Sequence, residues 1–100
     1  VTELIAARTM TRLAASKVDK NDSEATIYSA MAKRFATDVG FNVCNEALQI
    51  FGGYGYIQEY PLERYVRDVR VHQILEGTNE IMKMIIGRRM IMEDAASIIQ

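Results

Sequence analysis

The 100-residue sequence contains only one proline, six glycines and one cysteine. So few chain-breaking residues favour long helices over a fold of short strands and turns, and we expect an all-α protein. A single cysteine excludes an internal disulfide and cannot hold a zinc ion alone. His72, the single histidine, has no second ligand at metal-binding spacing, so we predict no metal site.

The sequence also has no marked excess of positive or negative charge and no long apolar run. The 12 basic residues nearly balance the 13 acidic ones, and the formal net charge is -1. This balance excludes the broad positive field that nucleic-acid binding requires. No apolar run approaches the roughly 18 residues of a membrane span. We therefore expect neither a nucleic acid nor a membrane among the partners, and the content of 49% hydrophobic and 25% charged residues is typical of a globular protein.

The spacing of apolar residues predicts an up-and-down bundle of about four helices, packed antiparallel or nearly so. The predicted helices cover residues 1–18, 24–51, 62–71 and 79–96. Residues 52–60 are rich in glycine and aromatic side chains, and we expect a loop there. Pro61 suits the start of the third helix, and Thr78 is a natural N-cap for the last one.

The predicted helix 24–51 has the most regular pattern. Its apolar residues step by three or four positions along one face, at Tyr28, Met31, Phe35, Val39, Val43, Ala47 and Ile50. This helix would be about 42 Å long, whereas a compact globule of this size has a radius of gyration of only about 13 Å. We see no internal boundary and expect residues 1–100 to be a single helical domain, a fragment of a larger protein.

The first candidate for chemistry is Glu76, which follows the apolar residues Ile74 and Leu75 and precedes Gly77. A carboxylate in apolar surroundings resists ionising and so suits a general base that works near neutral pH. Glycine lets a ligand approach the backbone closely. The alternative is a glutamate favoured at a helix N-terminus by the helix dipole, and from the pattern alone this alternative is the more common one.

Two helix ends are further candidates for ligand binding. Glycines at 52, 53 and 55 follow a helix, and their amides can face a phosphate or a ribose; a simple glycine C-cap and turn is the alternative. A Rossmann fingerprint is rejected because Gln58 stands in place of its third glycine and no strand precedes it. Free amides near Thr78 can receive a polar ligand. Capping alone is the alternative there, and Glu80 would repel an added anion.

Three strings of residues are far more specific together than singly. They read Gln49-x-x-Gly52-Gly53-x-Gly55-Tyr56, Glu59-Tyr60-Pro61-x-Glu63-Arg64-x-x-Arg67-Asp68 and Ile74-Leu75-Glu76-Gly77-Thr78-x-Glu80. In this order and spacing the sequence resembles the C-terminal helical domain of the acyl-CoA dehydrogenases. The resemblance covers essentially the whole chain and is strongest from Ala47 onward. Over residues 71–77 it looks closest to the isobutyryl-CoA dehydrogenase branch of the family.

The resemblance implies an FAD enzyme that forms an α,β double bond in an acyl-CoA thioester. Glu76 matches the catalytic base of the family, which removes the proton on the α-carbon while the β-hydrogen leaves as hydride to the flavin. Gly77 and Leu75 match the substrate site, and the Glu76 amide is expected to help hold the thioester carbonyl. The segment that touches FAD is matched by Thr78, Asn79 and Glu80. The segment that reaches the FAD of a neighbouring subunit is matched by Gln49, Ile50, Phe51, Gly52 and Gly53.

The resemblance also implies partners and a setting. Family members combine this domain with an N-terminal helical domain and a middle β-domain, form tetramers, and pass electrons to an electron-transferring flavoprotein. We expect a role in fatty-acid or branched-chain amino-acid breakdown, in the bacterial cytoplasm or, in a eukaryote, the mitochondrial matrix. Without the other two domains we expect the chain alone to be inactive and to bind no FAD stably.

One departure from the family bears on the substrate. Many relatives have an aromatic residue before the base, and this sequence has Leu75. The smaller side chain leaves room for a short, 2-methyl-branched acyl chain, which is our hypothesis for the substrate. Two alternative functions remain: a helical assembly module without chemistry, and a segment of an acyl-CoA oxidase that passes electrons to oxygen. We expect the apolar faces left by the missing domains to drive self-association.

Overall fold

The computed structural model describes residues 1–92 and 98, and this part of the chain is helical with no strand. Its helices are α1 (Thr2–Asp19), α2 (Ala25–Phe51), α3 (Gly53–Tyr56), α4 (Leu62–Val71) and α5 (Asn79–Met92). The predicted all-α class is confirmed, and the four predicted helices begin within one residue of their expected starts. The end expected for the last helix, at residue 96, lies outside the described residues.

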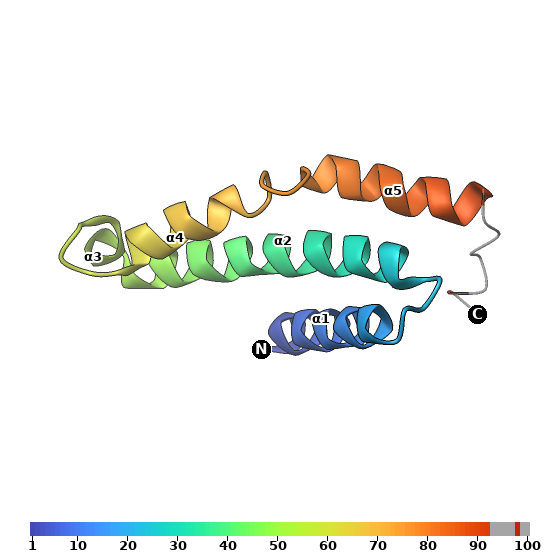
Figure 1. Cartoon of the computed structure of the whole chain (residues 1–100). Helices are drawn as coiled ribbons and strands as arrows, with labels where there is room; N and C mark the ends of the chain where they lie inside the picture. The colour runs from blue at the N-terminus through green and yellow to red at the C-terminus, as the bar shows by residue number, and fades with distance from the viewer. Residues whose placement is uncertain (93–97, 99–100) are drawn as a thin grey trace.

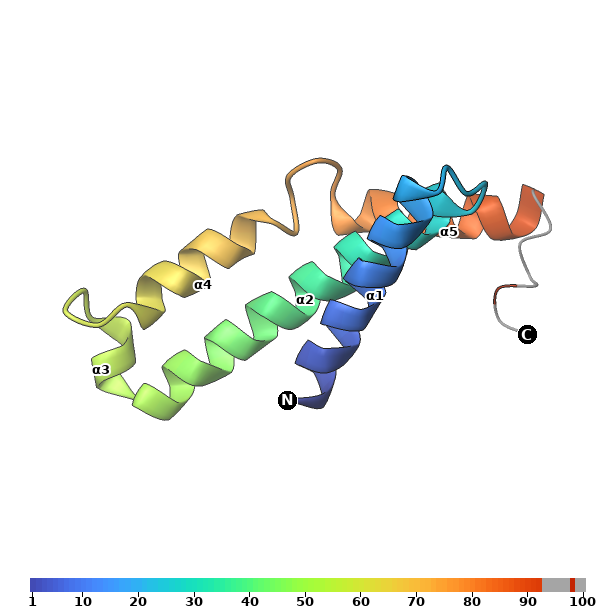
Figure 2. The ribbon, with the colours of Figure 1, turned by 60° about the horizontal axis from the view of Figure 1, so that its bottom comes forward.

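Helix α2 is the centre of the molecule and contacts each of the other helices (Figure 1). Figure 2 shows α1 on one side of α2, with α4 and α5 following each other along another side and α3 at the end near α4. Helices α1, α4 and α5 run opposite to α2 (Figure 1). Helices α4 and α5 therefore follow each other in the same direction, whereas the predicted up-and-down order alternates from each helix to the next. Among the described residues α1 contacts neither α4 nor α5, so the helices form an open, elongated body of 50 × 23 × 22 Å.

The short helix α3 corrects the prediction of a loop across residues 52–60. Gly52 leaves α2 with a left-handed backbone (φ 61°), and the Gly55 N–H donates to the Gly52 carbonyl at 2.9 Å. Gly55 lies so close to α2 that an added Cβ would be 2.5 Å from the Leu48 carbonyl oxygen. The glycine content of this segment predicted a loop. Composition does not reveal that the absence of a side chain at Gly55 lets one helical turn pack against α2.

The corner between α1 and α2 is held by charged side chains. Lys17 Nζ donates to Asp22 Oδ2 at 3.1 Å and to Glu24 Oε2 at 2.7 Å. Lys17 also lies 4.5 Å from the centre of the Tyr28 ring. Asp22 Oδ1 accepts the backbone N–H of Glu24 at 2.8 Å. These bonds set the direction in which the chain enters α2.

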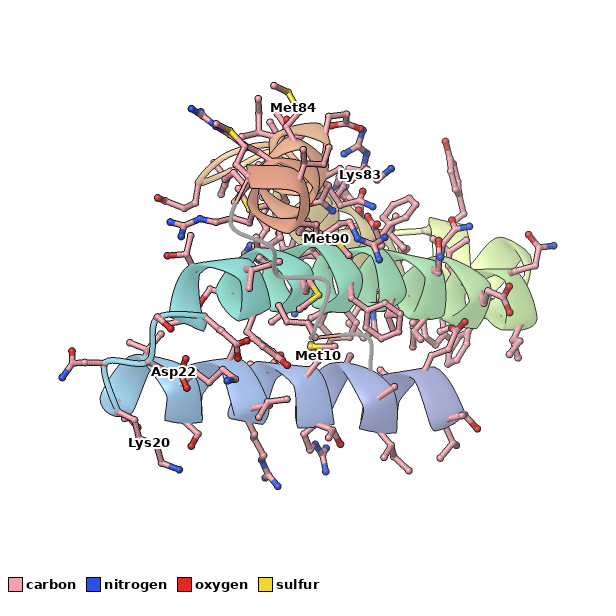
Figure 3. All side chains as sticks on the ribbon, turned by 90° about the vertical axis from the view of Figure 1, so that its right-hand side faces the viewer. Met10, Lys20, Asp22, Lys83, Met84 and Met90 are labelled. Carbon is pink, nitrogen blue, oxygen red and sulfur yellow. The ribbon has the colours of Figure 1, made fainter. Side chains whose placement is uncertain are left out.

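The core consists mainly of small side chains on α1 and α2. Its buried apolar members are Ala7, Ala14, Ile27, Ala30, Ala32, Val39 and Met82. Many larger apolar side chains lie at the surface, and Ile50 and Ile91 are each 85% exposed. Figure 3 shows Met10 pointing from α1 toward α2, whereas Met84 points away from it. None of the described helices combines the length and the apolar character needed to cross a membrane.

Candidate functional site

The turn between α4 and α5 carries residues 75–77 and lies beside the middle of α2 (Figure 1). Backbone hydrogen bonds close this turn on itself. The Leu75 N–H donates to the Val71 carbonyl at 2.9 Å, and the Asn79 N–H donates to the Gln73 carbonyl at 3.0 Å. The expected catalytic base is therefore placed on a compact turn between two helices.

Glu76 and Gly77 both have left-handed backbones, with φ of 55° and 90°. A residue with a side chain pays roughly 1–2 kcal/mol for this conformation, and such strain is concentrated at functional sites. At Gly77 an added Cβ would lie 2.7 Å from Met82 Cε. The backbone conformation therefore favours glycine directly after Glu76, whereas the end of the flexible Met82 side chain can shift to make room.

A buried hydrogen-bond network joins this turn to α2. Asn79 is only 4% exposed, and its Nδ2 donates to Asp38 Oδ1 at 2.7 Å and to Thr37 Oγ1 at 2.8 Å. Its Oδ1 accepts from Lys33 Nζ at 2.7 Å. Gln73 Nε2 donates to the same Asp38 oxygen at 2.8 Å. Buried polar groups need partners, and α2 supplies them here.

The network gives the Asn79 side chain a structural role, and the cofactor contact expected from the motif stays a prediction. Its side chain faces α2 and fastens the first turn of α5 to that helix. Lys33, Thr37 and Asp38 are parts of the site that the motifs did not predict. Lys33 and Thr37 are four residues apart and so share one face of the helix. That polar pair on a largely apolar helix is the signal that could have revealed them.

Lys33 is the charged residue of α2 that reaches the turn itself. Its Nζ donates to the Gly77 carbonyl oxygen at 2.7 Å, in addition to its bond with Asn79. Hydrogen bonds from an ammonium group are stronger than those between neutral groups. In the described part of the chain, no three acidic, histidine or cysteine side chains are grouped in a way that could hold a metal ion.

The surroundings of Glu76 are more open than the sequence pattern predicts. Glu76 is exposed, and the apolar residues before it are also exposed, Ile74 at 51% and Leu75 at 47%. The described residues therefore do not supply the apolar cover expected around the carboxylate. Glu76 instead borders an open hollow of about 410 Å³ between α1, α2 and α5, whose lining includes Lys33 and Met82.

The start of α5 confirms the predicted cap. Thr78 Oγ1 accepts the backbone N–H of Ile81 at 3.3 Å. Glu80 in the first helical turn is exposed, and a negative side chain is favourable at this end of the helix dipole. The helix start is thus stabilised by its own residues, and the expected contact of Thr78 and Glu80 with FAD stays a prediction.

The second predicted cofactor segment lies at the far end of α2 (Figure 1). Its members are all exposed: Gln49, Ile50, Phe51, Gly52 and Gly53. Thr37 lies beside Asn79, and the helical path from Thr37 to Gln49 corresponds to about 18 Å. A single chain therefore keeps this segment apart from the turn that carries Glu76.

Comparison with protein families matches the chain to one domain family. The model described as "Acyl-CoA dehydrogenase, C-terminal domain" matches residues 1–91. The mitochondrial isobutyryl-CoA dehydrogenase of Bos taurus is 51% identical over 90 residues, and that of Dictyostelium discoideum is 52% identical over 93 residues. These matches cover 90% and 93% of this chain and 22% of each relative.

A solved structure shares the fold. The butyryl-CoA dehydrogenase of Megasphaera elsdenii superposes with a TM-score of 0.86 and 43% sequence identity. That match covers 90% of this chain and 23% of the other. The chain thus spans only about a fifth to a quarter of the length of the relatives it matches.

Proposed function

Because this chain belongs to the acyl-CoA dehydrogenase family through its C-terminal domain, we propose that it supplies the catalytic base for FAD-dependent α,β-dehydrogenation of a short acyl-CoA. The base is Glu76. The observation that carries the proposal is the left-handed turn of Glu76 and Gly77, which presents an exposed carboxylate beside a hollow. Strained residues of this kind are concentrated at functional sites.

In the proposed reaction the Glu76 carboxylate takes the proton from the α-carbon of the thioester. The Glu76 backbone N–H is available for the thioester carbonyl, since it donates to no carbonyl among the described residues. Such a donor stabilises the negative charge that develops on the carbonyl oxygen as the proton leaves. FAD, when bound, accepts the β-hydrogen as hydride. A carboxylate works as a base more effectively away from water, so we propose that substrate and the other domains of a longer protein cover Glu76.

The exposed turn at Gly52 and Gly53, which follows α2, suits the approach of FAD from a neighbouring subunit of a tetramer. Nothing lies within 4 Å of an added Cβ at Gly52 or Gly53, and the amides of such a turn suit a phosphate or a ribose. The turn begins at Gly52, about 22 Å along α2 from Thr37, which lies beside Asn79. We therefore propose that Gln49–Gly53 and Thr78–Glu80 contact different FAD molecules.

The substrate we propose is a short, 2-methyl-branched acyl-CoA, with Gly77 and Leu75 in the acyl site. Two similar proteins are named isobutyryl-CoA dehydrogenases, and Leu75 is smaller than an aromatic residue. Electrons then pass to an electron-transferring flavoprotein. The names of both relatives include "mitochondrial", and we propose the mitochondrial matrix in a eukaryote or the cytoplasm in a bacterium.

Substitution Glu76→Gln in the full-length protein tests the proposed base. We expect kcat to fall by about 10²- to 10⁴-fold, because the amide cannot accept the proton, while FAD content and assembly stay unchanged. Glu46→Gln, at an exposed site on α2, is the matched control and should leave kcat unaltered. Stopped-flow reduction of the flavin by acyl-CoA measures the chemical step directly.

The alternative role is assembly without chemistry, which the exposed apolar side chains at the end of α2 favour. Unchanged turnover in Glu76→Gln would leave only this role. Loss of turnover together with loss of FAD would also fail to support Glu76 as the base, because it would indicate a folding defect.

A further inference from the structure

We propose that Lys33 is a positioning residue that holds the Glu76–Gly77 turn in its working conformation. The inference rests on the proposed role of Glu76 as the base. Lys33 Nζ donates to the Gly77 carbonyl oxygen and to Asn79 Oδ1, each at 2.7 Å. These bonds connect the middle of α2 to a turn more than 40 residues later in the sequence.

The geometry of the turn explains why such a bond is needed. Two successive left-handed residues, Glu76 and Gly77, are less favourable than an ordinary turn. A bond to the Gly77 carbonyl restrains the peptide between Gly77 and Thr78, directly after the left-handed pair, and therefore opposes relaxation of the pair. Lys33 makes no ion pair with a carboxylate among the described residues. Its described hydrogen bonds go to Gly77 in this turn and to Asn79 at the start of α5.

The hydrogen bonds of the network that do not involve Lys33 allow its effect on the turn to be distinguished from an effect on folding. Asn79 also donates to Thr37 and Asp38, and Gln73 donates to Asp38, and none of these bonds involves Lys33. These bonds fasten α4 and α5 to α2, but they do not reach Gly77. Loss of Lys33 should therefore leave the helices docked and release only the turn that carries Glu76.

Lys33 also faces the space that Glu76 borders. Both residues line the same hollow of about 410 Å³. An acyl-CoA that fills this region would exclude water from the Lys33 bonds and strengthen them. The turn would then be held most firmly at the moment the α-proton is removed, so the effect of Lys33 should fall on kcat more than on KM.

The test uses the full-length protein with Lys33→Met, which keeps the chain length and removes the donors. We expect kcat to fall by about 10- to 100-fold, the loss typical of a misplaced catalytic group, with KM, FAD content and melting temperature little changed. Lys33→Arg keeps charge and donors and should recover most of the lost kcat. Lys20→Met is the matched control, since Lys20 is exposed at the end of α1, on the opposite side of α2 from α5 (Figure 3).

Several results would overturn the positioning role. The first is a kcat of Lys33→Met close to that of the parent. The second is a loss of kcat that accompanies loss of FAD or of folded protein, and the third is a failure of Lys33→Arg to recover kcat. If Lys33→Met does not fold, Lys33→Gln, which keeps one donor group without the charge, replaces it under the same criteria. The variant Glu76→Gln, measured in parallel, keeps the two proposals distinct. Full activity of Glu76→Gln would refute the role of Glu76 as the base. An inactive Glu76→Gln together with a Lys33→Met of normal kcat would refute only the positioning role of Lys33.

Discussion

At position 77 the backbone conformation explains why the motif has a glycine. Its φ of 90° disfavours any side chain, and an added Cβ would also meet the end of the flexible Met82 side chain at 2.7 Å. The sequence pointed to Gly77 as a close-approach residue, but nothing in it indicated that Glu76 also adopts a left-handed backbone. Glutamate rarely does so, and the bond from Lys33 to the next residue's carbonyl depends on packing against α2, which the sequence does not display.

The residue before the base is expected to set the acyl-chain preference. We predict that the full-length parent prefers isobutyryl-CoA to butyryl-CoA, and that Leu75→Tyr lowers the ratio of the two kcat/KM values by about tenfold or more. The larger ring would occupy the space of the methyl branch. Steady-state kinetics with both thioesters measures the ratio.

Leu13→Tyr, the same substitution at an exposed site on α1, should leave that ratio unchanged. A parent enzyme with a clear preference for butyryl-CoA would contradict the branched-substrate hypothesis, whatever the variant does.

Among the elements, α2 shows most clearly what periodicity predicts and what it omits. The bounds of this helix were predicted within one residue, because they depend on local signals such as the glycines that follow it. Its polar contacts were not predicted. They depend on which face of α2 meets the turn after α4, and that face is chosen by packing. The same limit applies to α3, where the buried position of Gly55 converts an expected loop into a helical turn.

The charged side chains at the corner between α1 and α2 should make the folding stability depend on pH in the acid range. The backbone N–H of Glu24 and the ammonium of Lys17 hold the pKa of Asp22 below its ordinary value. Because folding lowers this pKa, Asp22 stabilises the folded chain above the ordinary carboxyl range, and the contribution is lost as pH falls through the lower folded value.

Asp22→Asn is therefore predicted to lower the melting temperature at neutral pH and to flatten its decline between about pH 5 and pH 2. Circular dichroism melting across that range measures both effects. Asp19→Asn, an exposed carboxyl at the end of α1, serves as the control. An unchanged acid profile in Asp22→Asn would show that the corner does not contribute as described.

On the scale of the whole molecule, the chain leaves much apolar surface uncovered. The body is open and elongated, and many of its large apolar side chains are exposed. We predict that the 100-residue chain expressed alone forms assemblies larger than its 11.3 kDa monomer, since association removes this surface from water. Light scattering coupled to gel filtration measures the mass.

The double variant Ile50→Lys with Ile91→Lys should shift the chain toward monomer, because both side chains are 85% exposed. Gln58→Lys adds charge at an exposed polar site and should not. A clean monomer of the parent chain at high concentration would contradict the prediction. The absence of stable FAD binding by the isolated chain stays a prediction that the same gel filtration tests by absorbance.

The sequence alone determined the four longer helices and the strings that carry the family likeness. Helix starts and ends depend on hydrogen bonds between near neighbours, so local spacing is sufficient to predict them. Only the tertiary structure decided that Lys33 meets Gly77, that Asn79 is buried against α2, and that Glu76 stays exposed in this chain. The first two features join residues more than 40 positions apart, and such contacts exist only once the helices have packed.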